Sequence, residues 1–164
     1  MCYYDAYVKG YNSIAVFEDD IVFNVDLEKM NTAIDDFFSI DLNVQVLFMG
    51  YCHILCKPAN KRGKALTNTL FELHHQARAV CNHALIWKQK AIEKYMEREN
   101  VVYWTHTNDN TLDLWMRQER IKKVVTKFEY VSQDREHMGS FNENNWKNKW
   151  EEKNFKRGCR FDGE

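Results

Sequence analysis

The stretch from Ile14 to Phe23 constrains the fold of this chain more than any other. Its opening apolar run, Ile14–Phe17, leads directly into three acidic residues, Glu18, Asp19 and Asp20, and a second apolar run follows. A short apolar run bounded by turn signals predicts a buried strand, and such strands are typical of parallel sheets covered on both faces. We therefore expect an α/β fold with a mainly parallel sheet, in which this strand is central and ends in three carboxylates.

Three carboxylates at the end of a buried strand need a counter-charge, because desolvation disfavours the ionised form. A hard divalent cation held by oxygen ligands is a common solution. Ligands of open α/β sheets also bind outside the carboxyl ends of the strands, which is where these acids are expected. A solvated acidic turn after an edge strand explains the same residues, and spacing alone leaves both interpretations open.

The next segments predict a strand, a helix and a strand. Asp26 is a good helix N-cap, and apolar residues recur at intervals of three and four up to Phe38. Val44–Met49 is a second apolar run, closed by Gly50. This order predicts a right-handed crossover between parallel strands.

Further elements are predicted with less regular patterns. Asn82 and His83 interrupt a third apolar stretch. The other expected elements are the end of a helix over 3–9 with Gly10 as its C-cap, a helix over 88–99, a strand or turn over 101–104, a helix starting at Asn108 or Asp109, and extended pieces at 124–125 and 128–131.

Composition narrows the class of protein. The chain has 164 residues, is 45% hydrophobic and carries a net charge of −1, which favours one globular domain and gives no indication of nucleic-acid binding. No apolar run is long enough to span a bilayer, and residues 1–5 lack the pattern of a signal peptide. Five cysteines without a dense framework predict reduced thiols in a cytoplasmic setting. Cys52 and Cys56 around His53 could begin a zinc site, but idle thiols are the favoured interpretation.

A basic cluster stands in the least regular part of the chain. Lys61, Arg62 and Lys64 accompany a proline and a glycine, which predicts an exposed loop. The favoured interpretation is a solvated loop. The alternative is a flexible cover over a phosphate-bearing ligand.

Several motifs together resemble one family. Phe17–Ile21 resembles the acidic motif of glycosyltransferase family 25, which includes lipooligosaccharide and collagen galactosyltransferases. The strand that ends in Gly50, the segment Cys81–Ile86, the segment Asp113–Met116 and the stretch from Gln133 to Ser140 resemble further motifs of the family in the same order. The resemblance implies a GT-A-like nucleotide-diphospho-sugar transferase domain over 1–142, followed by a polar tail or short helix over 143–164.

The resemblance also implies a reaction. A hexose, galactose or glucose, would pass from a nucleotide-diphosphate sugar, with UDP as the expected nucleotide, to a hydroxyl of a glycan or glycoprotein. Mn²⁺ or Mg²⁺ would bridge the diphosphate and neutralise the charge that develops on it. Asp20 is the implied metal ligand, together with Glu18 and with His137 as a third candidate.

The remaining roles follow from the same resemblance. Glu18, Asp19 and His83 would lie against the donor or its metal. Asp113, with Asp109 second, would accept the proton of the acceptor hydroxyl. Each has an ordinary structural explanation: a turn cap for Asp19, a core histidine for His83, helix N-terminal placement for both aspartates, and a solvated loop for His137.

The family's nucleotide-binding fold has a β-α-β unit before the acidic motif, whereas only thirteen residues precede Ile14 here. An N-terminally shortened domain is therefore expected, with poor sugar transfer and an exposed sheet edge that favours a homodimer. A catalytically inactive binding module derived from a transferase is the alternative. A metal-dependent phosphate-ester hydrolase ranks third, because no second acidic cluster stands at ligand spacing.

Overall fold

The structure, a computed structural model, describes residues 2–40, 43–51, 53–55, 64–99 and 108–134, and all statements below concern these residues. Side chains are described for most of them, but not for 53–55, 80, 98–99 and 108–110. The helices are α1 (Cys2–Lys9), α2 (Leu27–Ser39), α3 (Gln89–Glu99) and α4 (Asn108–Gln118). The strands are β1 (Ser13–Phe17), β2 (Ile21–Phe23), β3 (Val44–Gly50), β4 (His53–Leu55), β5 (Lys64–Ala65), β6 (Leu70–Leu73), β7 (Arg78–Val80), β8 (Ala84–Lys88), β9 (Lys122–Thr126) and β10 (Val131–Gln133).

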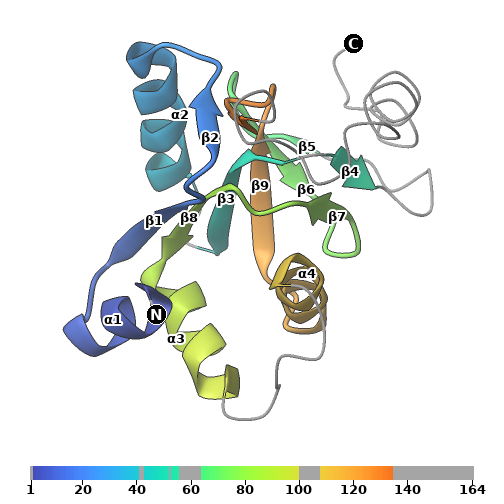
Figure 1. The fold of residues 1–164 in the computed structure, drawn as a ribbon. Coiled ribbons are helices and arrows are strands. Elements are labelled where there is room, and N and C mark those ends of the chain that lie inside the picture. Colours follow the sequence, from blue (N-terminus) through green and yellow to red (C-terminus); the bar gives the residue numbers. More distant parts are fainter. Residues whose placement is uncertain (1, 41–42, 52, 56–63, 100–107, 135–164) are drawn as a thin grey trace, which may run out of the picture.

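The main sheet is mixed and mostly antiparallel. Its six strands lie in the order β1-β8-β3-β9-β6-β5, and only the pair β3–β9 is parallel (Figure 1). The fold is therefore α/β as predicted, but the expectation of a mainly parallel sheet is wrong. The apolar runs of β3 and β8 are buried, as in a parallel sheet, yet a buried run carries no information about strand direction.

β1 lies at an edge of this sheet, so its predicted central position is also wrong. It pairs with β8 alone, and its residues alternate between half-buried and exposed, with Ala15 and Phe17 facing solvent. Four apolar residues fit an edge strand because one face packs on the core while the ring of Phe17 contacts that of Phe23, with centroids 5.9 Å apart. β1 and β3 both run antiparallel to β8, so they point the same way with β8 between them.

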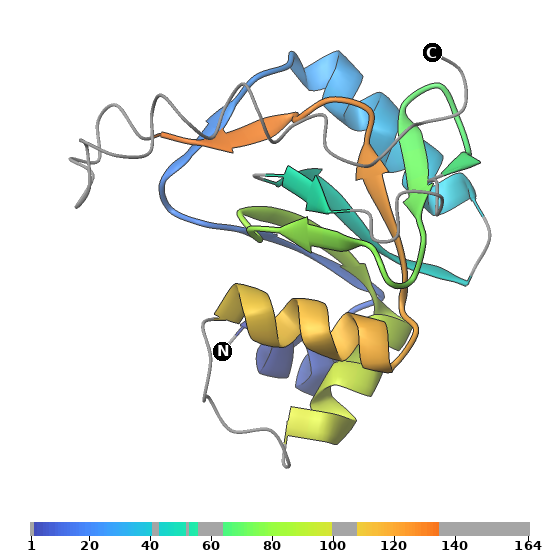
Figure 2. The ribbon, with the colours of Figure 1, turned by 90° about the vertical axis from the view of Figure 1, so that its right-hand side faces the viewer.

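Helices cover both faces of the sheet (Figure 2). α2 lies on one face, where Met30, Ala33 and Phe37 join an apolar cluster with β3 and β8. α1, α3 and α4 lie on the other face, around a cluster in which the rings of Trp87 and Trp115 stack at 5.7 Å. The two faces therefore have separate cores, and the sheet is held from both sides.

The predicted helix boundaries are largely confirmed. α2 begins after Asp26, whose side chain accepts a hydrogen bond from the backbone N–H of Lys29 at 2.8 Å. α1 ends before Gly10, which has a φ of +65° as a C-cap glycine should. The predicted strand or turn over 101–104 and the tail over 143–164 lie outside the described residues.

The cysteines differ from the prediction. Cys81 is disulfide-bonded, with its partner outside the described residues, whereas Cys2 is an exposed free thiol. The expectation of reduced thiols is therefore wrong for Cys81, and the thiol-based argument for a reducing compartment does not hold. Cys52 and Cys56, the start of the alternative zinc site, lie outside the described residues.

Within the described ranges, no helix is both long and apolar enough to cross a membrane.

Candidate functional site

The acidic residues after β1 form a turn that leads into β2. β2 pairs with β10 in an antiparallel register that sets Gln133 opposite Ile21. The backbone N–H of Asp134 donates to the carbonyl oxygen of Asp20 at 2.6 Å, which extends this pairing into the turn. Two segments that are distant in sequence therefore meet at the acidic turn.

The side chain of Gln133 brings two of the three acids together. Its Nε2 lies 3.1 Å from Glu18 Oε2 and 3.4 Å from Asp20 Oδ2, and all three residues are partly buried. Because the same amide group donates to both carboxylates, the two carboxylates point toward the same place. Asp19 is exposed and makes neither of these contacts.

His83 supports the same turn from the side of β8. Its carbonyl oxygen accepts a hydrogen bond from the backbone N–H of Glu18 at 3.0 Å, so its main chain fixes the start of the acidic segment. Its ring is 1% exposed, and Nε2 lies 3.4 Å from Glu129 Oε1. Within the described part of the chain, neither ring nitrogen has a hydrogen-bond partner. His83 is thus a buried residue beside the turn, which agrees with a core histidine and leaves its predicted role near a donor untested.

Gly50 allows β3 to pack closely against His83 and β10. A Cβ atom at this position would meet Cδ2 of His83 well inside contact distance and the carbonyl oxygen of Val131 at 2.8 Å. Because the second contact is with backbone, it cannot be relieved by a rotamer change. β3 therefore needs a glycine where β10 and His83 pack against it.

Replacing Gly50 with alanine is expected to lower the free energy of unfolding by about 1–3 kcal/mol through overpacking. Urea denaturation measures the change. Gly10 is the control, since a Cβ there meets nothing within 4 Å and the only penalty is its φ of +65°. Asparagine tolerates that conformation, so Gly10→Asn should cost less than Gly10→Ala, whereas Gly50→Asn should cost more than Gly50→Ala. Equal stability of Gly50→Ala and the wild type would contradict the close packing.

Asp113, in the middle of α4, lies in a second cluster of charges. Its Oδ2 is 2.9 Å from Arg78 Nε, which donates a hydrogen bond, and its Oδ1 is 3.4 Å from Lys123 Nζ. Arg117 Nε lies 3.0 Å from Oδ2, close enough for an ion pair but without a hydrogen bond. Asp113 and Lys123 are buried, whereas the two arginines are about one-third exposed.

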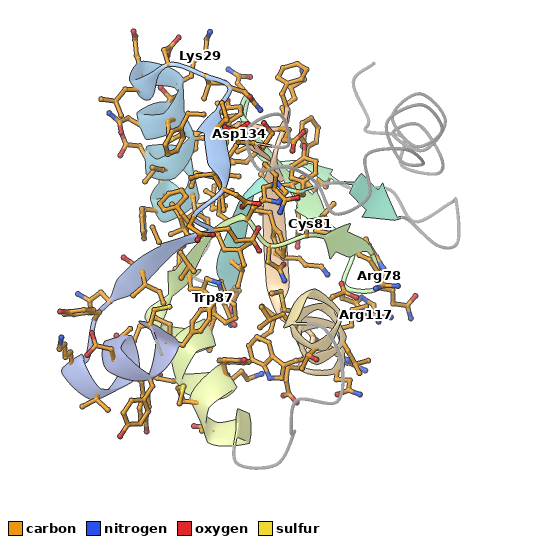
Figure 3. The ribbon with its side chains drawn as sticks, in the orientation of Figure 1. Lys29, Arg78, Cys81, Trp87, Arg117 and Asp134 are labelled. Carbon is orange, nitrogen blue, oxygen red and sulfur yellow. The ribbon has the colours of Figure 1, made fainter. Side chains whose placement is uncertain are left out.

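This cluster is separate from the acidic turn. Figure 3 shows Arg117 on α4 with Arg78 close to it, while Asp134 lies near β2, apart from both arginines. The structure therefore brings Glu18, Asp20 and His83 together and places Asp113 elsewhere. Asp109 lies in the first turn of α4 without a described side chain, and His137 is outside the described residues.

The fit of a divalent metal depends on Glu18 and Asp20. No group of three or more His, Cys, Asp or Glu side chains among the described residues could hold a metal ion by itself. Mg²⁺ and similar hard ions bind through one or two carboxylates together with substrate phosphates, so a convergent pair of carboxylates suffices as the protein's share. Among the described residues, Glu18 and Asp20 are the two carboxylates that this turn could offer such an ion, and in the structure the amide nitrogen of Gln133 donates to both.

Sequence reasoning did not assign roles to Gln133 and Glu129. Gln133 stood within a motif of the resemblance, but its link to Glu18 and Asp20 depends on the register of β2 and β10, which are three residues each. Glu129 precedes β10 in a stretch without periodicity. A pairing of two such short strands leaves no sequence signal that would predict it.

Comparison with models of known protein families gives no match for this chain, and comparison with curated proteins gives none either.

Proposed function

We propose that this chain is a metal-dependent glycosyltransferase domain of a GT-A-like type, which transfers a hexose from a UDP-sugar to a hydroxyl of a glycan or glycoprotein. The observation that carries the proposal is the convergence of Glu18 and Asp20 on the amide of Gln133, directly after β1. The resemblance to family 25 transferases supports it, because the segments that meet here, Phe17–Ile21, the Gly50 strand, Cys81–Ile86 and Gln133, all belong to the motifs that carry the resemblance.

In this proposal each residue of the turn has a distinct task. A divalent ion, when bound, neutralises charge on the departing diphosphate. Asp20 would hold that ion, and Glu18 would orient the ribose or a water molecule at the site. Gln133 keeps the two carboxylates convergent, which limits the reorganisation that binding requires. His83 fixes the start of the turn through its carbonyl oxygen, which accepts a hydrogen bond from the backbone N–H of Glu18.

The proposed base for the acceptor hydroxyl is Asp113, with Asp109 second. A general base needs an oxygen within hydrogen-bond reach of the proton that it takes. Both oxygens of Asp113 are engaged by cations. This observation favours the second candidate function, a transferase-derived module that binds a metal and a nucleotide without transferring sugar.

Asp20→Ala is expected to weaken the binding of Mn²⁺ with UDP at least tenfold, because it removes the carboxylate proposed to ligate the ion. Isothermal titration calorimetry with both ligands measures this. Asp35→Ala, at an exposed position on α2, is the matched control and should bind like the wild type. Equal affinities for wild type and Asp20→Ala would place the metal elsewhere and overturn the proposal.

Turnover then separates the two candidate functions. UDP-hexoses are offered with Mn²⁺ and a panel of glycan acceptors, and release of UDP is measured. Transfer that is lost in Asp20→Ala establishes the enzyme. Binding without transfer, with all acceptors, favours the binding module.

A further inference from the structure

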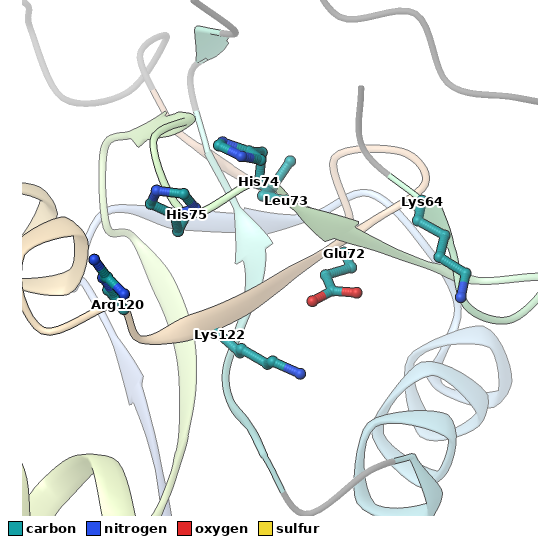
Figure 4. Close-up of a pocket in the computed structure, with 7 residues that line it drawn as sticks. All are labelled: Lys64, Glu72, Leu73, His74, His75, Arg120 and Lys122. Atoms are coloured by element: carbon teal, nitrogen blue, oxygen red, sulfur yellow. The ribbon is translucent and has the colours of Figure 1, made fainter. Parts of the chain in front are cut away.

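A pocket of about 500 Å³, lined mostly by charged residues and histidines, lies at the edge of the main sheet farthest from β1. The residues that line it are Lys64, Glu72, Leu73, His74, His75, Arg120 and Lys122 (Figure 4). Three of these side chains are cationic at neutral pH, and one is a carboxylate. A chain with a net charge of −1 therefore carries a locally basic hollow at this place.

Strand register explains how the charged side chains gather. Lys64 of β5 pairs directly with Glu72 of β6, and Glu72 pairs with Val124 of β9. Lys122 is two residues from Val124 on the same strand, so it projects from the same face as Glu72. In Figure 4 the Glu72 carboxylate lies between Lys122 and Lys64. The strand register therefore places Lys64 and Lys122 on either side of Glu72.

Three further lining residues, Arg120, His74 and His75, belong to two turns. Arg120 follows α4 and has a φ of +51°, a left-handed conformation that is uncommon outside glycine and asparagine. His74 and His75 follow β6, with ring centroids 4.1 Å apart. These side chains add one cation and two imidazoles to the lining of the pocket.

The hairpin that carries Lys64 and Glu72 is anchored to α2. The hydroxyl groups of Thr67 and Thr69 both donate to Asp36 Oδ2, the first at 2.6 Å. The backbone N–H of Leu70 in turn donates to the hydroxyl of Thr67 at 3.1 Å. The floor of the pocket is therefore positioned before any ligand arrives, which lowers the cost of ordering it.

We propose that this pocket binds the dianionic phosphate group of a small phosphate monoester. Lys64, Lys122 and Arg120 supply the charge-assisted donors that a phosphate needs, and the imidazoles add further donors. The volume exceeds that of a phosphate ion and falls in the range of pockets for small organic ligands, so room remains for the group that the phosphate esterifies. The inference does not depend on the proposed transfer reaction, because none of its residues belongs to the acidic turn.

The test uses the full chain and two probes, galactose 1-phosphate and inorganic phosphate, each titrated and followed by calorimetry and by ¹H–¹⁵N NMR. Lys122→Gln is expected to weaken binding of the sugar phosphate about tenfold, because it removes one charge-assisted contact. Glu72→Gln is expected to tighten it severalfold, because it removes the repelling carboxylate. Lys90→Gln, at an exposed position on α3, is the control and should leave the affinity unchanged.

Opposite effects of Lys122→Gln and Glu72→Gln, with NMR shifts confined to the residues around the pocket, would establish the site. Tighter binding of galactose 1-phosphate than of inorganic phosphate would assign it to an ester rather than to the free ion, and the reverse order would overturn the ester assignment. Equal affinities in all three variants, or a loss in Lys90→Gln as large as in Lys122→Gln, would overturn the proposal. Thermal melting of each variant ensures that only folded protein is compared.

Discussion

Asp113→Asn is expected to lower the free energy of unfolding by about 3–5 kcal/mol, because it removes the only carboxylate among the ion pairs described around buried Lys123. The carboxylate of Asp113 compensates Lys123 at 3.4 Å and also contacts both arginines. Asparagine keeps the shape but not the charge, so the ammonium group of Lys123 is left without compensation in the interior. Denaturation in urea at pH 7 measures the loss.

The pH dependence of this loss has a definite sign. Burial lowers the pKa of Lys123 below its ordinary value, and the charge of Asp113 opposes that shift. A lysine whose pKa is lower in the folded state destabilises the fold fully at pH values below the folded pKa, and the penalty falls as pH rises from the folded pKa to the ordinary pKa of lysine. Without Asp113 the folded pKa falls further. The stability difference between wild type and Asp113→Asn should therefore shrink as pH rises from 7 toward about 10.

Lys123→Met provides the matched control. It removes the buried ammonium group but leaves Asp113 with Arg78 and Arg117, so it should cost less than Asp113→Asn. The double variant should recover part of the loss, since no buried charge then lacks compensation. A cost for Asp113→Asn below about 1 kcal/mol, constant with pH, would contradict a structural role and favour its role as a base.

The helices and the buried strands were predictable from local signals. The Asp26 cap, the apolar stripe of α2 and the glycine after α1 are features of neighbouring residues, and the structure confirms the cap and the glycine. Of the stripe it buries Met30, Ala33 and Phe37, whereas the end residues Leu27 and Phe38 are exposed. The run Val44–Gly50 is fully buried, as its composition indicates. These signals operate within one turn or one strand, which is why single-sequence reasoning detects them.

Strand order was not predictable for a physical reason. An apolar run indicates that a strand is buried. It does not indicate which strand lies beside it or in which direction that neighbour runs. β8 inserts between β1 and β3 and leaves β1 at the edge, and no residue in Ile14–Phe17 encodes that position. The disulfide of Cys81 was not predictable for the same reason, because a disulfide depends on which two cysteines meet in space.

The candidate site was predictable only in part. The three acids stand out because carboxylates after an apolar strand are conspicuous, and two of them do converge. Gln133, which joins them, is an ordinary residue in a three-residue strand and becomes informative only once β10 is paired with β2. The sequence suggested helix N-terminal placement for Asp113, whereas the structure puts it in the middle of α4. Its neighbours Arg78 and Lys123 come from other elements, so local sequence did not indicate them.

Trp87→Ala is the other substitution with a large expected effect, a loss of about 3–5 kcal/mol in the free energy of unfolding. Trp87 is fully buried on β8, and its ring lies 4.7 Å from that of Tyr3, 5.5 Å from that of Tyr95 and 5.7 Å from that of Trp115. It thereby joins the sheet to α1, α3 and α4 at once. Alanine would leave a cavity that these rings cannot fill without moving apart.

Two further variants isolate this effect. Trp87→Phe keeps an aromatic ring and removes an indole N–H that has no hydrogen-bond partner in the described structure, so its cost should be well below that of alanine. Phe128→Ala removes a ring that is 66% exposed and should change stability by less than about 0.5 kcal/mol. Because β8 pairs with β1, which leads into the acidic turn, Trp87→Ala should also weaken the proposed binding of Mn²⁺ and UDP near its lowered unfolding midpoint, but not far below it. A loss of stability below about 1 kcal/mol in Trp87→Ala would mean that the aromatic cluster does not hold the three helices to the sheet.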